Sequence, residues 1–313
     1  MLQINPAPIF KKNSNTPQTL HKNRCGVKKA IIPIAGLGTR FLPLSKVLPK
    51  ELWPLVDKPV IQYIVEEVKA SGIKEIIFVD RPGRKLVSDY FQKKLKSKKA
   101  SFAKYKNHFL KELENLENIS QSISFSKTFQ ETPLGAAHAV LQAKNLVGKE
   151  PCAVLWADDV VESKVPCLLQ LIKVFQKYQK PVIALYRIPK ESFQFYGMVE
   201  VEKITKHLFK IKRVAEKPSI TEAPSDLAIV GKYIITPEIF DYLRKTHFDL
   251  KSDITLSETV IDIARDGKEV YGYEFEGKWL ECGNKLAYLK SNLYLSLKHP
   301  QFGKELRKYL KTI

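Results

Sequence analysis

Apolar residues along this chain occur in short continuous runs that alternate with amphipathic segments. Residues 29–35 form the first run, which is typical of a strand buried on both faces. Residues 60–70 then place apolar side chains three and four positions apart, as one face of a helix does, and a second run follows at 75–79. A strand, a helix and a strand in this order predict a βαβ unit with parallel strands.

The alternation continues as far as residue 186. It predicts further helices and strands at 135–146, 152–156, 166–178 and 182–186. We therefore expect an α/β fold with a Rossmann-like, mostly parallel mixed sheet that is flanked by helices on both faces. Ligands of such sheets bind beyond the carboxyl ends of the strands, so the chemistry is expected in the loops that follow them.

After Gly197 the predicted strands become shorter, and helices follow them toward the C-terminus. The strands are expected at 198–201, 209–215, 228–235 and 269–275, and the helices at 237–246, 254–265 and from about 285 onward. Residues 1–27 are polar and lack periodicity, which predicts a disordered tail. The rest of the chain is expected to form one domain over 28–298 with a helical C-terminal extension at 299–313.

Hydrophobicity, cysteine content and net charge indicate which classes of protein this chain can belong to. The chain of 313 residues has no apolar run near the roughly 18 residues that span a bilayer, so no membrane segment is expected. Its 4 cysteines form no C-x-x-C pair, which predicts a reduced, cytoplasmic protein. The net charge of +19 is compatible with nucleic acid, an anionic membrane surface or an anionic substrate. Because the lysine-rich stretches lack interleaved aromatic residues, solvated lysine faces are favoured and nucleic-acid binding is not expected.

The loop after the first strand carries the most informative pattern. Gly36 and Gly38 let backbone N–H groups approach phosphate oxygens, and Arg40 and Lys50 bring cations that neutralise a nucleoside triphosphate. The spacing excludes a Walker A loop, because the lysine that this motif requires is not in place. It also excludes a dinucleotide fingerprint, because the third glycine of that motif is missing. Glycine spacing alone would indicate an ordinary tight turn.

Two carboxylates follow the predicted strand at 152–156. Asp158 and Asp159 are hard oxygen donors at the end of a buried strand, which suits Mg²⁺, although an aspartate here can equally cap a helix or a turn. If a nucleoside triphosphate is the substrate, transfer of its nucleotidyl group to another phosphate would need mainly positioning and charge neutralisation. The attacking phosphate oxygen is already anionic, so no strong protein base is required. Lys, Arg and Asp residues scattered over strand ends are therefore its expected signature.

Several segments together resemble the sugar-1-phosphate nucleotidylyltransferases, and most of all the bacterial UTP–glucose-1-phosphate uridylyltransferases. They occur in the family's order at 29–43, 49–54, 130–140, 196–200 and 214–218, and the resemblance covers about residues 28–300. It implies the nucleotide-diphospho-sugar transferase fold and a catalytic domain. It also implies transfer of UMP from UTP to glucose 1-phosphate, giving UDP-glucose and pyrophosphate, with Mg²⁺ as cofactor and a homo-oligomer, either a dimer or a tetramer.

The resemblance implies roles for individual residues. Catalytic roles fall to Arg40, Lys50, Asp158 and Lys217, and the metal ligands would be Asp158 and Glu281. A glutamine and the backbone near a glycine would read the pyrimidine, and a glutamate would accept hydrogen bonds from the glucose hydroxyls. The residues expected to bind substrate are Ala35, Gly36, Gly38, Thr39, Glu51, Gln130, Gly135, Asp159, Gly197 and Glu216.

Three residues depart from the family's pattern. Ala137, Glu281 and Trp53 stand where relatives usually carry glycine, aspartate and leucine. Glutamate keeps the charge but is longer, which would shift the metal, and Trp53 would reshape the pocket wall. Two alternatives stay open: a nucleotidylyltransferase for another nucleotide or sugar 1-phosphate, and a weakly active regulatory paralogue. A polyanion-binding protein is supported by net charge alone.

Overall fold

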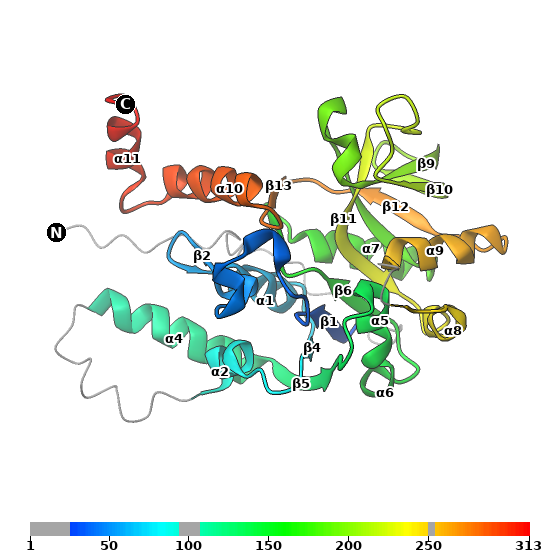
Figure 1. Cartoon of the computed structure of the whole chain (residues 1–313), viewed down its shortest axis with the longest axis horizontal. Helices are drawn as coiled ribbons and strands as arrows, with labels where there is room; N and C mark the ends of the chain where they lie inside the picture. The colour runs from blue at the N-terminus through cyan, green and yellow to red at the C-terminus, as the bar shows by residue number, and fades with distance from the viewer. Residues whose placement is uncertain (1–25, 94–106, 250–253) are drawn as a thin grey trace.

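The structure is a computed structural model that describes residues 26–93, 107–249 and 254–313. The predicted disordered tail therefore lies almost entirely outside the described residues. A nine-stranded sheet forms the centre of the molecule (Figure 1). Its strands, in spatial order, are β5 (Ser124–Phe129), β4 (Glu75–Asp80), β1 (Lys29–Pro33), β6 (Cys152–Leu155), β11 (Leu227–Ile235), β8 (Val182–Arg187), β12 (Tyr271–Glu274), β10 (Leu208–Glu216) and β9 (Gly197–Lys203).

The α/β fold with a mixed sheet is confirmed, although its parallel part is smaller than the sequence predicts. Strands β5, β4, β1 and β6 are parallel, and so are β8 and β12. Strand β11 runs antiparallel to both β6 and β8, and β9 and β10 pair antiparallel. Strands β6 and β8 are not neighbours in the sheet, because β11 lies between them and runs antiparallel to both. No local sequence pattern predicts this insertion.

Helices cover both faces of the sheet, as predicted. Along β1, Ala30 and Ile32 pack into one core and Ile31 into the other, because successive side chains of a strand point to opposite faces. The first core includes residues of α1 (Val60–Ala70), α4 (Asn107–Ser122) and α7 (Cys167–Tyr178). The second includes residues of α5 (Gly135–Gln142), α8 (Ile239–Lys245) and α9 (Leu256–Arg265).

Smaller elements surround this frame, and several were not predicted. Strands β7 (Asp159–Glu162) and β13 (Lys278–Glu281) form an antiparallel pair that brings two distant carboxylates together. The predicted helix at 135–146 is split into α5 and α6 (Lys144–Val147). The remaining elements are η1 (Thr39–Phe41), η2 (Leu44–Lys46), η3 (Lys50–Leu52), β2 (Pro54–Leu55), β3 (Lys58–Pro59), α2 (Leu86–Gln92), η4 (Lys190–Phe195), α10 (Lys285–Lys298) and α11 (Gly303–Tyr309).

None of the described helices is both long and apolar enough to cross a lipid bilayer.

A buried ion pair joins strand β11 to helix α1 on one face of the sheet. Lys232 of β11 is 0% exposed, and its ammonium lies 2.8 Å from Oε2 of Glu67 in α1. The other oxygen of Glu67 accepts a hydrogen bond of 2.9 Å from the backbone N–H of Leu168, at the start of α7. Neither charge is solvated, so each is tolerated only because the other is present.

Lys232→Ala would leave the Glu67 carboxylate buried without a cation. We expect a loss of about 3–5 kcal/mol in the free energy of unfolding, measured by urea denaturation. Lys212→Ala is the matched control, because Lys212 pairs with Glu202 on the surface and its loss should cost no more than about 1 kcal/mol. Equal losses in the two variants would contradict the role of this pair.

Candidate active site

A cavity of about 210 Å³ opens where the central strands and the β7–β13 pair end. Its walls come from segments far apart in the sequence, including the loop after β1, the ends of β6 and β10, and the start of α9. Charged residues gather on it: Arg40, Asp158, Asp159, Glu216 and Glu281. The cavity therefore lies at the strand ends, where the fold class predicts the ligand site.

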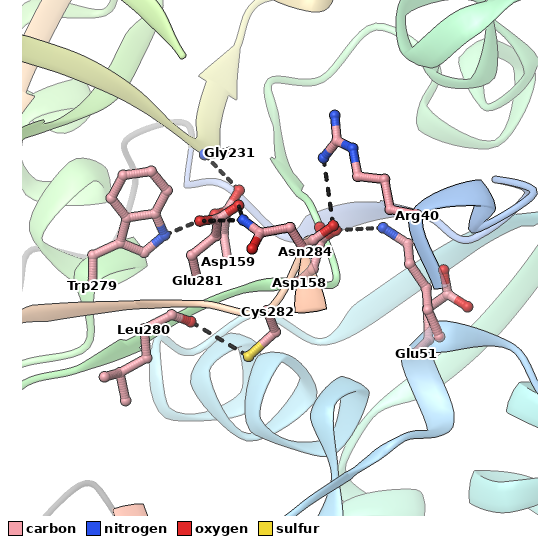
Figure 2. Close-up of polar contacts among 12 residues, drawn as sticks. Arg40, Glu51, Asp158, Asp159, Gly231, Trp279, Leu280, Glu281, Cys282 and Asn284 are labelled. Atoms are coloured by element: carbon pink, nitrogen blue, oxygen red, sulfur yellow. Dashed lines mark hydrogen bonds and ion pairs between the residues drawn. The ribbon is translucent and has the colours of Figure 1, made fainter. Parts of the chain in front are cut away.

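Lys50 forms a direct ion pair with Asp158 beside this cavity. Arg40 and Asp158, which are labelled in Figure 2, both line the cavity. Nη1 of Arg40 donates a hydrogen bond of 3.4 Å to the carbonyl of Gly283. Burial by itself raises the pKa of Asp158, but the charge of Lys50 and its hydrogen bond, with a smaller effect of Arg40, hold this pKa below its usual value. The structure thus brings together the three residues from which the sequence predicts triphosphate chemistry.

Asp159 turns away from this pair and holds the surrounding strands together. Its Oδ2 accepts a hydrogen bond of 3.0 Å from the N–H of Gly231 in β11, and its Oδ1 accepts one of 2.7 Å from the indole of Trp279 in β13. Burial, and then the neighbouring carboxylates of Asp158 and Glu281, raise the pKa of Asp159 to about 7. Asp159 lines the cavity, but both of its carboxylate oxygens accept hydrogen bonds that hold β11 and β13 in position.

Glu281 faces Asp158 across the backbone of Gly283. Oε2 of Glu281 accepts a hydrogen bond of 2.5 Å from the hydroxyl of Tyr196, and Asn284 donates to both carboxylate oxygens at 3.0 and 3.1 Å. Burial raises the pKa of Glu281, partly offset by these donors. A Cβ on Gly283 would lie 3.0 Å from Oδ2 of Asp158 and 3.3 Å from Oε1 of Glu281, so both carboxylates border the space that this glycine leaves free.

Two carboxylates that border one space are a donor set of the kind that a hard divalent cation prefers. Mg²⁺ commonly binds one or two carboxylates and completes its shell with water and substrate phosphates. In the described part of the chain, no three His, Cys, Asp or Glu side chains cluster closely enough to hold a metal by themselves. Asp158 and Glu281 can therefore supply two ligands, and the others would have to come from phosphate and water.

Two of the predicted sugar-binding residues, Gly197 and Glu216, meet in the wall of the cavity. A Cβ on Gly197 would lie 3.0 Å from Oε2 of Glu216, so only glycine allows the carboxylate to approach this backbone so closely. Lys217 has a positive φ of 44°, and its N–H donates a hydrogen bond of 3.1 Å to the carbonyl of Tyr196. Its ammonium is 3.6 Å from Oε1 of Glu216, but Lys217 does not line this cavity.

The predicted nucleotide-binding residues lie outside this cavity, in the loops after β1 and β5. Gly38 has a φ of 65°, and its carbonyl accepts a hydrogen bond of 2.8 Å from Oγ of Ser45. Gln130 is buried, and its Nε2 lies 2.9 Å from the carbonyl of Gly135 and 3.0 Å from Nδ1 of His138. Gln130 and Gly135 are thus brought together; Ala35, Gly36 and Thr39 follow β1 without lining the cavity.

Sequence reasoning missed several residues of the site. Gly231 is not among the predicted site residues, yet a Cβ there would lie 2.1 Å from Cδ1 of Trp156 and 2.2 Å from Oδ2 of Asp159. Tyr196 and Asn284 hold Glu281, but no spacing links them to it. The start of α9 was detectable, because Thr255 and Glu258 form a capping box, and Thr255 lines the cavity.

Trp53 does not shape the wall of this cavity, so that prediction is wrong. Its ring packs 4.5 Å from Phe41 and 5.5 Å from Tyr288, in contact with the first core. Its position after η3 directs it toward α10 and away from the strand ends.

Comparisons with known proteins agree with this geometry. A family model described as nucleotidyl transferase matches residues 29–296. A UTP–glucose-1-phosphate uridylyltransferase of Staphylococcus epidermidis is 37% identical over 292 residues, which are 92% of this chain and 98% of that protein. A crystal structure of a UDP-glucose pyrophosphorylase complexed with UDP-glucose is 34% identical with a TM-score of 0.79, covering 87% of this chain and 100% of the other. The UDP-glucose pyrophosphorylase of Acinetobacter baumannii is 33% identical with a TM-score of 0.80, covering 91% of this chain and 99% of the other.

Glu51 provides a test of the electrostatics beside Lys50. Its carboxylate is 2% exposed, and burial, opposed by Lys50 and Arg84, raises the pKa from its ordinary value of 4.5 to about 7. The folded state therefore binds this proton more tightly than the unfolded chain. The resulting contribution to stability is complete below pH 4.5 and is lost as pH rises through about 7.

Glu51→Gln removes this pH-dependent loss of stability, because the amide stays uncharged at every pH, as the protonated carboxyl is at low pH. The free energy of unfolding of the variant, relative to that of the unaltered chain, should rise by about 2 kcal/mol as the pH is raised from about 5 to about 8. Urea denaturation at each pH measures this difference. Glu114→Gln is the control, because the Glu114 side chain is exposed and should leave the pH dependence unchanged. A parallel pH dependence of the Glu51→Gln variant and the unaltered chain would refute the argument.

Proposed function

This chain belongs to the nucleotidyl transferase family, among the UTP–glucose-1-phosphate uridylyltransferases, and from this premise we propose that it transfers UMP from UTP to glucose 1-phosphate in a Mg²⁺-dependent reaction. The products are UDP-glucose and pyrophosphate. An oxygen of the sugar phosphate attacks the α-phosphorus of UTP, and the bond from that phosphorus to the bridging oxygen of the leaving pyrophosphate breaks. Because the nucleophile is already anionic, the protein's task is to align two anions and offset their repulsion.

One observation carries the proposal: Arg40 and Asp158 line a single cavity and Lys50 pairs with Asp158 beside it, although the three residues come from two separate strand ends. Arg40 contacts the triphosphate, and Lys50 contacts the phosphates during transfer. An ammonium already held by Asp158 needs little reorganisation to meet the charge that develops on the phosphates.

The residues around Gly283 are suited to Mg²⁺. Asp158 and Glu281 would hold it, and when bound it would offset the negative charge of the phosphates. Glutamate in place of the family's usual aspartate is accommodated here, because Tyr196 and Asn284 fix its carboxylate.

The part of the cavity wall at Gly197 and Glu216 suits the sugar. Glu216 is an acceptor for glucose hydroxyls, the backbone of Gly197 allows close approach, and Lys217 is near enough to Glu216 to reach the sugar phosphate. Gln130 and Gly135 would read the pyrimidine, together with the loop from Ala35 to Thr39.

The three described cysteines are buried and form no disulfides, which supports a cytoplasmic location.

The proposal is tested by pyrophosphate release from a panel of nucleotides and sugar 1-phosphates, with and without Mg²⁺. We expect the highest turnover with UTP and glucose 1-phosphate, and none after chelation of the metal. Equal or better turnover with dTTP or another sugar would support the alternative of a different specificity. No turnover with any pair would support the regulatory alternative.

Asp158→Asn should lower kcat by at least about 10²-fold in this assay, because it removes the carboxylate that pairs with Lys50 and serves the metal. Asp262→Asn makes the same chemical change at a surface pair with Arg265 and should leave turnover unaltered. Full activity of the Asp158→Asn variant would remove Asp158 from the reaction.

The chain also has a surface suited to self-association, and we infer a homodimer formed through α10. Leu286, Leu289 and Leu293 lie along this helix at intervals of three and four residues and are 62, 61 and 43% exposed. Figure 1 shows α10 and α11 extending from the rest of the chain at one end of the molecule. A twofold axis would pack this stripe against its own copy.

Leu289→Glu should convert the dimer to a monomer in light scattering, because a buried carboxylate in an apolar contact is costly. Ile220→Glu is the control, since Ile220 is similarly exposed, at 57%, but lies far from α10 in the sequence. A monomeric unaltered chain, or an unchanged mass for the Leu289→Glu variant, would refute this arrangement.

A further inference from the structure

A second cavity lies between the loop after β1 and the segment after β4. Its volume is about 360 Å³, which is within the range of small-molecule sites. Ser45, Lys46, Val47 and Pro49 form one side, and residues 81–86 form the other. The two cavities have no lining residue in common.

The charge of this cavity has one sign. Of the described residues that line it, Lys46, Arg81, Arg84 and Lys85 are cationic, and none is acidic. Burial, and then the neighbouring Arg84, lower the pKa of Arg81, as expected where like charges are crowded. A concave surface lined by one sign of charge concentrates ions of the opposite sign.

Arg84 alone among these cations is held by the protein's own acceptors. Its guanidinium donates a hydrogen bond of 3.0 Å to the carbonyl of Ile34 and lies 3.6 Å from Asp80 and 3.7 Å from Glu51. Within the described residues, the side chains of Lys46, Arg81 and Lys85 have no carboxylate at ion-pair distance. Nε of Arg81 is buried and has no hydrogen-bond acceptor. Arg81 lines the cavity, and because its guanidinium has no acceptor among the described residues, an anion bound there would displace none.

We propose that this second cavity binds an oligophosphate, either inorganic pyrophosphate or the phosphate chain of a nucleotide, at a site separate from the active site. Arginine forks and lysine ammonium groups match the charge and oxygen geometry of phosphates. No aromatic side chain lines the cavity among the described residues, so a base has no ring to stack on, and the ligand is recognised through its phosphates.

Two residues that line this second cavity are linked to residues of the active site, one by sequence and one by an ion pair. Pro49 lines it and precedes Lys50, while Arg84 lines it and pairs with Glu51. An anion that draws Arg84 away from Glu51 would change the charge next to Lys50. The inference does not rest on the proposed reaction, because binding is measured without turnover.

The test is calorimetric titration of inorganic pyrophosphate into the full chain. The starting protein is the Lys50→Ala variant, which removes the phosphate-binding lysine of the active site. We expect one site per chain to persist in that variant. Adding Lys46→Ala and Lys85→Ala should weaken this binding at least about tenfold, since two of its four cations are lost. Both lysines are exposed, so the substitutions should leave folding intact, as circular dichroism will verify.

The control adds Lys173→Ala and Lys304→Ala instead, which removes the same charge from exposed positions on α7 and α11. Affinity equal to that of the Lys50→Ala protein is expected. Loss of all pyrophosphate binding on Lys50→Ala alone, or equal effects of the two lysine pairs, would overturn the proposal. Parallel titrations with UTP and UMP identify the source: a lysine-dependent loss for UTP and pyrophosphate but not UMP indicates a nucleotide's phosphate chain, and a loss for pyrophosphate alone indicates the free anion.

Discussion

The ion pair between Lys50 and Asp158 is the interaction on which the rest of the site depends. It joins residues 108 positions apart, and without the ammonium the carboxylate would be a buried, uncompensated charge. With it, the loop after β1 is held against the end of β6, and Arg40 is brought to the same cavity. A site for two anionic substrates is thereby assembled in advance, so little reorganisation is left for the reaction itself.

The β7–β13 pair extends this arrangement to the other carboxylates. Its register places Glu281 opposite Asp159, and each is then held by different donors: Asp159 by Gly231 and Trp279, Glu281 by Tyr196 and Asn284. Three carboxylates can lie close together because each has its own partners. This division also explains why Asp158 and Glu281, rather than Asp158 and its neighbour Asp159, border the space at Gly283.

The loop after β1 has a distinct charged environment on each side. On the active-site side, Lys50 is compensated by Asp158. On the side of the second cavity, Arg84 is paired with Asp80 and Glu51, whereas Lys46, Arg81 and Lys85 have no carboxylate of the described residues at ion-pair distance. The net charge of +19 is therefore not spread evenly as solvated surface lysine. Part of it is concentrated in a concave site, where it produces a stronger local field.

The sequence by itself determined the local elements and the chemical types of the site. Apolar periodicity located β1, α1, β4 and most later helices within a few residues, because a helical face and a buried strand impose their spacing on the side chains. The motif around Arg40 and Lys50 and the carboxylate at Asp158 were visible for the same reason: each is a short pattern at the end of one element.

Only the tertiary structure decided how those ends meet. The antiparallel entry of β11, the β7–β13 pair and the contacts of Tyr196 with Glu281 join residues that are distant along the chain, and no local spacing specifies such pairings. The need for glycine at 231 and 283 likewise depends on side chains that approach from other strands. Period and propensity act within a few residues, whereas the packing of the whole sheet determines which strand ends share a cavity.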